Sequence, residues 1–483
     1  MKVAKWLVVF SVIVAAAAGF GGCENPWMKD AVAPLRDKNK NDPFFPGPSR
    51  EELWNAEDFG PAAALTGTFT VDSAAAWNSA LTAISGGGSN KNYVVNLTGS
   101  ADVPASGFGS VTGLTVSLRG GTLSCSDSSA SLLTVGNSQT LVIRNCTLQG
   151  DTDNARPLLQ IDSGGTAALK TGAIMGNTGA GISGGGVLVY GTFTMAGGTI
   201  SGNTATGGNG GGGVYVTGTG ASFIMTGGTI SGNTVSAGLA GCGVYLSSGV
   251  FTMTGGTISG NNVGSGGGGG VRVNGGIFTL GGDAVISNNS AGYGGGVSVE
   301  GGTVIINGGT ISGNESFSGG NGGGVCLAGG NVTMTGGTIS GNRSTYAVYG
   351  CGGGVYITDA TSTFTMAGGT IRENTAVESG GGVYIALGTF NMTNGMILRN
   401  TAATQGGGVY AQSGTTFTKT GGTIYGSDGG TNANTVTAGN TNGRAVYSAG
   451  GPRYRDNTVG NTGDSMGSIG VTAGNVYSGD WST

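Results

Sequence analysis

The chain contains no histidine and few charged residues. Of its 483 residues, 20 are Lys or Arg and 24 are Asp or Glu, so the formal net charge is −4. Without histidine, the commonest general base and the commonest metal ligand are both missing. The scarcity of basic residues, with no basic run, argues against a nucleic-acid partner. We therefore expect no metal, no cofactor and no nucleic acid to be bound.

Proline is also scarce, with nine residues, whereas glycine is abundant, with 107. The glycines do not follow the Gly-X-Y period of collagen, and nine prolines are too few for that fold. Thr, Val, Ile and Phe recur between the glycines, which is typical of strands separated by turns. The composition thus indicates an all-β chain.

An eight-residue phrase returns about every 25–32 residues, for example at Phe193–Ile200, Phe251–Ile258 and Val332–Ile339. Repetition at such a period is typical of a stacked solenoid. Twelve modules cover residues 116–424, and the first and last apolar positions of the phrase lie seven residues apart in all but one.

The exception is the module from Phe278 to Ile286, whose separation of eight residues predicts a β-bulge. Alternation places Phe251 and Met253 inward and Thr252 outward. A second phrase, Gly-Gly-Gly-Val-Tyr-Val or a variant, follows in each later module.

Tyrosines recur at equivalent outward positions of this second phrase, between inward apolar residues such as Val214 and Val216. Such a stripe either stacks on a sugar or a partner protein or stabilises neighbouring coils. The candidate binding face consists of Tyr215, Tyr245, Tyr356, Tyr384 and Tyr410.

An asparagine follows the last Ile of the phrase by three residues. A side-chain amide that recurs at one corner can hydrogen-bond to its copies in the coils above and below, which satisfies polar groups in a buried turn. The sequence predicts a structural ladder formed by Asn177, Asn203, Asn233, Asn261, Asn289, Asn314, Asn342, Asn374 and Asn400.

Fixed inner spacing and corners of variable length predict a parallel β-helix of about 13 coils, each with three short strands. Asp72-Ser73 is typical of a helix N-cap, and Trp77, Leu81 and Ile84 follow at helical spacing. We expect this short helix to cap the first coil, whose open edge would otherwise favour aggregation.

The amino terminus has a basic start, an apolar stretch and then Phe20-Gly21-Gly22-Cys23, which resembles a bacterial lipobox. The resemblance implies cleavage before Cys23 and lipid attachment to it; an ordinary secretory signal is the alternative. We divide the chain into five parts. Residues 1–22 are a lipoprotein signal peptide, residues 23–60 a lipidated polar tether, and residues 61–115 an N-terminal cap with the first coils. Residues 116–424 are the β-helix repeats, and residues 425–483 are a C-terminal cap.

Ile200-Ser201-Gly202-Asn203 followed by Gly211-Gly212-Gly213-Val214 resembles the FxxN and GGA[ILV] motifs of chlamydial polymorphic outer-membrane proteins. The repeats are also similar to right-handed parallel β-helices of other bacterial surface proteins. This resemblance implies a right-handed helix, a cell-surface location and adhesion. Ile replaces the Phe of FxxN, and residues 425–483 are too short for a carboxy-terminal barrel, so lipid on Cys23 would serve as the anchor.

Pectate lyases and related enzymes share this fold, but glycosidic cleavage needs carboxylates at a fixed separation. Here the acidic residues are scattered, and Glu373 and Glu378, which could share a corner, are better explained as solvated loop charges. Cys125 and Cys146 lie about one coil apart, and a disulfide between them stays open.

We therefore expect a non-enzymatic, monomeric outer-membrane lipoprotein that is exposed on the cell surface. We expect it to act as an adhesin or interaction module and to bind a host or environmental glycan or protein. The variable corners after the asparagines would carry specificity, because their length changes from four residues after Asn289 to nine after Asn342. A carbohydrate-binding or lyase-like β-helix and a passive envelope spacer are the alternatives.

Overall fold

The computed structural model describes residues 50–60, 63–125, 130–152, 154–179, 183–236, 238, 240–319, 321–437, 443–449 and 453–455. The chain divides into two compact units, residues 1–63 and 64–483. In the first unit, α3 (Arg50–Phe59) is a ten-residue helix within the segment that the sequence predicted as a tether. The predicted signal peptide and Cys23 lie outside the described residues.

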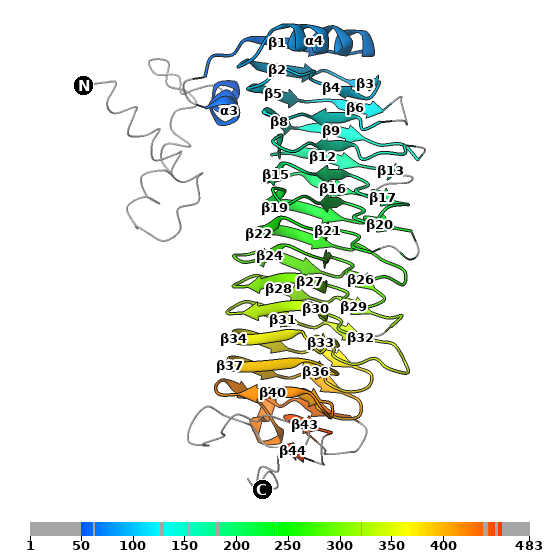
Figure 1. The fold of residues 1–483 in the computed structure, drawn as a ribbon, viewed down its shortest axis with the longest axis vertical. Helices are drawn as coiled ribbons and strands as arrows, with labels where there is room; N and C mark the ends of the chain where they lie inside the picture. The colour runs from blue at the N-terminus through cyan, green and yellow to red at the C-terminus, as the bar shows by residue number, and fades with distance from the viewer. Residues whose placement is uncertain are drawn as a thin grey trace, which may run out of the picture. The chain divides into compact units, whose positions relative to one another are not determined.

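The second unit is an all-β parallel solenoid of about 13 turns, as the sequence predicted, with strands stacked in register along its length (Figure 1). Four series of strands follow one another around each later coil. We name them the Phe, Ile, corner and Val series after the residues or the position that characterise them. The right-handed sense implied by the resemblance stays a prediction.

The Phe series carries the start of the eight-residue phrase. Its strands are β1 (Gly67–Val71), β2 (Asn92–Leu97), β5 (Leu114–Arg119), β8 (Gln139–Arg144), β11 (Thr166–Leu169), β15 (Thr192–Met195), β24 (Ile277–Leu280) and β40 (Thr416–Lys419). Four long strands bend through the Gly-Gly pair and continue into the Ile series: β19 (Ser222–Ser231), β22 (Val250–Ser259), β34 (Thr363–Arg372) and β37 (Thr389–Leu398).

The Ile series ends the phrase. Its remaining strands are β3 (Ser100–Val103), β6 (Thr122–Cys125), β9 (Cys146–Gln149), β12 (Gly172–Met175), β16 (Thr199–Ser201), β25 (Val285–Ser287), β28 (Thr310–Ser312), β31 (Thr338–Ser340) and β41 (Thr423–Ile424).

The Val series carries the second phrase. Its strands are β4 (Ser106–Gly107), β7 (Leu133–Val135), β10 (Leu159–Ile161), β14 (Val187–Val189), β18 (Val214–Val216), β21 (Val244–Leu246), β23 (Val271–Val273), β33 (Val355–Ile357), β36 (Val383–Ile385), β39 (Val409–Ala411) and β43 (Val446–Ser448). Two further strands run from the Val series into the Phe series, β27 (Val297–Ile306) and β30 (Val325–Met334).

The corner series was missed by the sequence analysis, which expected three strands per coil. Its two-residue strands directly follow the recurring asparagines, and two residues carry too little periodicity to be recognised as a strand. They are β13 (Thr178–Gly179), β17 (Thr204–Ala205), β20 (Thr234–Val235), β26 (Ser290–Ala291), β29 (Glu315–Ser316), β32 (Arg343–Ser344), β35 (Thr375–Ala376), β38 (Thr401–Ala402) and β42 (Thr435–Val436).

The core consists of columns of identical or similar apolar side chains, because in-register pairing places each inward residue above its counterpart in the next coil. Phe223 stacks on Phe251 with ring centroids 4.6 Å apart, and Phe251 stacks on Phe278 at 4.8 Å. These separations match the ~4.8 Å spacing of paired strands, so the rings stack without bending the backbone. The predicted inward positions Met253, Val214 and Val216 are fully buried, which confirms the alternation.

The predicted bulge at Phe278 and Ile286 is wrong. β24 and β25 each pair in register with β22, and the extra residue lies between them in a turn closed by the Ala284 N–H donating to the Gly281 carbonyl at 3.2 Å. A turn absorbs an added residue without moving either strand, which explains why the register is retained.

Two elements mark the ends of the stack. α4 (Ala74–Gly86) lies at the amino-terminal end (Figure 1), with Ser73 as its N-cap, as the sequence predicted. At the other end, β44 (Arg453–Arg455) pairs antiparallel with β43. There η1 (Ser427–Asn432) precedes β42, and Lys419 replaces the inward methionine of the preceding coil, Met392.

We expect Trp77→Ala to destabilise the amino-terminal coils by about 3–5 kcal/mol, because a large buried side chain is lost from the cap. Trp77 is 1% exposed, and its indole N–H donates to the Ser106 hydroxyl at 3.0 Å. Denaturant titration of the full chain measures the change. Asn78→Ala, on the exposed side of α4, is the control. Equal midpoints for both variants would refute a capping role.

Candidate functional site

The predicted tyrosine face lies on the Val series. Register pairs join Tyr215 to Tyr245 and join Tyr356 to Tyr384 and Tyr410. Tyr447 on β43 extends the second run. Between the two runs, the equivalent positions hold Arg272, Ser298 and Cys326.

The rings of the longer run stack on one another. Tyr384 and Tyr410 have ring centroids 4.6 Å apart with planes 8° from parallel, and Tyr410 and Tyr447 are 5.2 Å apart at 11°. Within this run, each ring face is therefore covered by the next ring. A sugar stacks on an open aromatic face, so this geometry favours the alternative that the tyrosines stabilise neighbouring coils.

The first run departs further from an open face. Tyr215 is 6% exposed and Tyr245 is 4% exposed. The Asn209 side-chain amide donates to the Tyr215 hydroxyl at 3.2 Å, and the Arg272 guanidinium lies over the Tyr245 ring. These two rings offer little exposed surface to a ligand, and their role in binding stays a prediction. In the longer run, burial raises the pKa of the Tyr356 hydroxyl to about 12, so this hydroxyl is protonated at neutral pH.

An ion pair interrupts the stripe. The Arg272 guanidinium lies 5.2 Å from the centre of the Tyr245 ring and contacts the Glu300 carboxylate, which also accepts a hydrogen bond from the Tyr293 hydroxyl at 3.2 Å. Among the described residues, Arg272 Nε and the Ser298 hydroxyl are buried without a partner. The cluster continues the side-chain stacking of the Val series through a cation–π contact.

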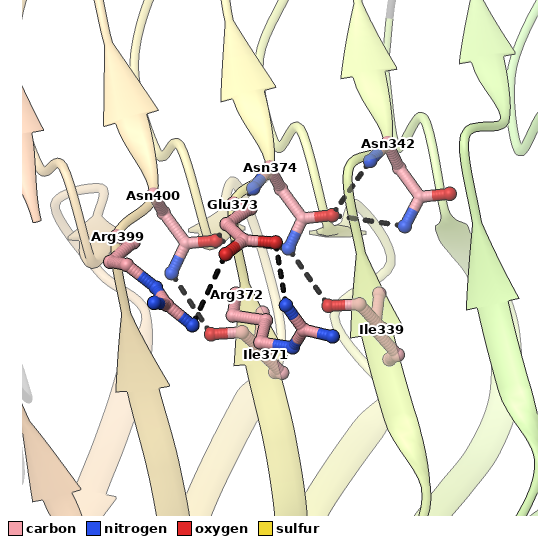
Figure 2. A network of polar contacts seen from close by, with 8 residues as sticks. All are labelled: Ile339, Asn342, Ile371, Arg372, Glu373, Asn374, Arg399 and Asn400. Carbon is pink, nitrogen blue, oxygen red and sulfur yellow. Dashed lines mark hydrogen bonds and ion pairs between the residues drawn. The ribbon is translucent and has the colours of Figure 1, made fainter. Parts of the chain in front are cut away.

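The asparagine ladder is present and fully buried. The Asn374 side-chain amide donates to the Ile339 carbonyl at 3.0 Å and to Asn400 Oδ1 at 2.9 Å (Figure 2). Its Oδ1 accepts from the backbone N–H and from the side-chain amide of Asn342, at 3.0 and 2.9 Å. Both amide protons and both lone pairs of the side chain are thus used, which is the full capacity of an asparagine.

Every asparagine predicted for the ladder is 0% exposed. The structure adds one residue at each end: the Asn154 side-chain amide donates to Asn177 Oδ1 at 2.9 Å, and Asn434 Oδ1 accepts from Asn400 at 2.8 and 2.9 Å. Sequence reasoning missed both because their spacing differs; ten residues separate Ile424 from Asn434, with η1 inserted between them.

The corner just before the ladder carries an exceptional charge cluster in two coils. Most coils have a left-handed glycine there, such as Gly341 with φ 62°, but Glu373 and Arg399 occupy the same conformation with φ 58° and 55°. Glu373 Oε2 contacts Arg372 Nη1 at 2.6 Å, and Glu373 Oε1 contacts Arg399 Nη2 at 3.1 Å (Figure 2). We name these three residues the corner triad.

Energetic comparison argues against a stabilising role for the corner triad. A left-handed backbone costs a residue with a Cβ roughly 1–2 kcal/mol. An exposed ion pair contributes about 0.2–1 kcal/mol, and the three side chains are 37–43% exposed. The two strained residues therefore cost more than the two ion pairs return.

The pair Glu373 and Glu378 does not share a corner. Glu373 precedes β35, whereas Glu378 follows it in the next loop. The carboxylate of Glu373 is also occupied by two guanidinium groups. In the described part of the chain, no group of three or more Cys, Asp or Glu side chains is arranged to hold a metal ion.

The variable loops follow the corner series. The longest, after Asn342, has Val348 55% exposed and Tyr349 66% exposed at its tip. Two backbone amides hold the base of this loop: the Glu378 N–H donates to the Gly350 carbonyl at 3.1 Å, and the Cys351 N–H donates to Asn321 Oδ1 at 3.3 Å. The tip is thus an ordered, apolar projection.

Cys125 and Cys146 are free thiols. The Thr147 N–H donates to the Gly121 carbonyl, so Cys146 lies beside Gly121, about 13 Å along the strand from Cys125. That separation is too large for the disulfide that the sequence left open. Burial raises the pKa of Cys146 and Cys326 to about 12 and that of Cys351 to about 11, which disfavours the reactive thiolate.

No protein-family model matches this chain, and comparison with curated proteins and with solved structures found none that is similar. Within the described residues, no helix is both long enough and apolar enough to cross a membrane.

Removing one asparagine from the middle of the ladder is expected to destabilise the protein by about 3–5 kcal/mol. Asn314→Ala leaves the buried N–H groups of Asn289 and the Ile286 carbonyl without their partners, and each unsatisfied group costs about 1–3 kcal/mol. Urea denaturation measures the loss. The exposed Asn307→Ala is the control, and similar stability of the two variants would contradict the ladder's role.

Glu373→Gly and Arg399→Gly are each expected to raise the free energy of unfolding by about 1 kcal/mol, because relief of the left-handed backbone exceeds the lost ion pair. Glu315→Gly is the matched control, since Glu315 lies in strand β29, where glycine is unfavourable. Denaturation midpoints that fall in all three variants would show that the corner triad does stabilise the coil.

Proposed function

We propose that this protein is a non-enzymatic interaction module of the cell surface, anchored by lipid on Cys23. The observation that carries the proposal is the concentration of length variation in one line of loops. The Phe, Ile and Val series keep their register from coil to coil, whereas the loops after the ladder differ in length and composition. Binding residues are commonly found on loops held by a rigid scaffold.

The exposed tip at Val348 and Tyr349 supports an interaction role. Large apolar side chains exposed to this degree are unusual on a surface that is otherwise rich in Thr, Ser and Gly. Aromatic side chains in an ordered loop lose little entropy on binding, and they often anchor an interface. We propose a protein or glycan ligand that contacts this row of loops.

The lipobox-like Phe20-Gly21-Gly22-Cys23 and the Ser-Gly-Asn corners support two further parts of the proposal. The first is attachment to the outer membrane as a lipoprotein. The second is kinship with the repeat regions of polymorphic outer-membrane proteins, with adhesion as the role. Lipid on one residue holds a protein at a membrane surface without a spanning helix.

Protease treatment of intact cells tests the proposal. We expect digestion of the wild-type chain on intact cells, and we expect Cys23→Ala to appear in the medium because it lacks the anchor. A periplasmic marker protein that resists digestion shows that the outer membrane stayed closed. Resistance of the wild-type chain until the membrane is permeabilised would exclude adhesion and favour a role within the envelope.

A further inference from the structure

The corner triad brings two guanidinium groups from neighbouring coils to one carboxylate. Arg372 ends β34, and Arg399 directly follows β37. In the coil before β34, the position of Arg372 holds Ser340, and the position shared by Glu373 and Arg399 holds Gly341, so that coil carries no charge there. Arg372 and Arg399 thus lie side by side, and Arg399 has a strained backbone conformation. Stability does not explain this arrangement, and strained residues are typical of functional sites.

Both arginines keep unused donors. Among the described residues, Arg372 uses Nη1 and Arg399 uses Nη2, each for Glu373. Their other N–H groups have no partner there, and both side chains are more than a third exposed. Glu373 neutralises one positive charge and holds the two guanidinium groups near each other. The corner triad therefore keeps a net positive charge, and its two guanidinium groups are pre-organised to donate paired hydrogen bonds.

The register neighbours around the two arginines include hydroxyl groups and one exposed methionine. Thr370 lies two residues before Arg372 on the same face of β34, and Met396 lies beside Thr370 in register. Thr375 and Thr401 follow in the corner series. Met396 is 43% exposed. Hydroxyls with an apolar spot complement the hydroxyls and C–H groups of a sugar ring.

We infer that Arg372 and Arg399 bind the acidic groups of a polysaccharide, either carboxylate or sulfate, with Glu373 as the positioning residue. Guanidinium groups recognise both anions through paired N–H donors. The inference deepens the proposed interaction function, on which its biological meaning rests, by naming one class of ligand.

Titration calorimetry on the purified full chain in a non-ionic detergent tests the inference. The probes are polygalacturonate, dextran sulfate and uncharged dextran. We expect one or both acidic polymers to bind, with weaker binding as salt screens the charges, and no binding of dextran. The polymer that binds distinguishes carboxylate from sulfate.

The test variant is Arg372→Ser combined with Arg399→Gly, which introduces the residue types of the coil that contains Ser340 and Gly341 and relieves the strained backbone at residue 399. We expect at least a tenfold loss of affinity. The control, Arg156→Gln combined with Lys170→Gln, removes the same charge from distant coils and should stay within about twofold of wild type.

Absence of binding to both acidic polymers, equal affinity in the two double variants, or equal binding of dextran would overturn the inference. These outcomes do not depend on where the protein lies in the cell. Protease resistance on intact cells would instead refute the surface function while leaving the binding site in place.

Discussion

The buried asparagine ladder is the interaction on which the solenoid depends. Each side-chain amide bonds to the coil before it and to the coil after it, and all of its donors and acceptors are used. From Asn177 to Asn400, each Asn is the third residue after the last Ile of the phrase, and only the end members Asn154 and Asn434 join with a different spacing. The ladder therefore fixes the backbone on one side of the corner and leaves the loop on the other side free to vary.

Much of this architecture could be predicted because the repeat expresses it many times. The spacing of Phe251 and Ile258, the inward positions and the ladder asparagines each recur, and in-register stacking makes recurrence in sequence equivalent to contact in space. The single corners that break the pattern were predicted less well. The extra residue before Ile286 lies in a turn, and Asn434 joins the ladder after an insertion.

The tyrosine stripe illustrates what a repeat does not determine. Alternation places Tyr215 and Tyr384 on the same outward face, yet one is covered and the other is half-buried. Tyr215 is contacted by Asn209 from one of the variable loops, and those loops are the part of each coil with the least shared pattern. The sequence could not predict the orientation of the rings either, because spacing along the chain does not determine whether a ring exposes its face or its edge.

Because the ladder contacts are the same from coil to coil, the solenoid can gain or lose whole coils during evolution. Any internal coil offers its neighbour the same Asn and Ile groups, so duplication or deletion of a whole coil leaves every buried hydrogen bond with a partner. The exceptions are the termini: α4 covers the first coil, and Lys419 replaces methionine in the core of a late one. The number of coils can therefore change during evolution while the two ends stay the same. Each gain or loss of a coil also changes the set of variable loops.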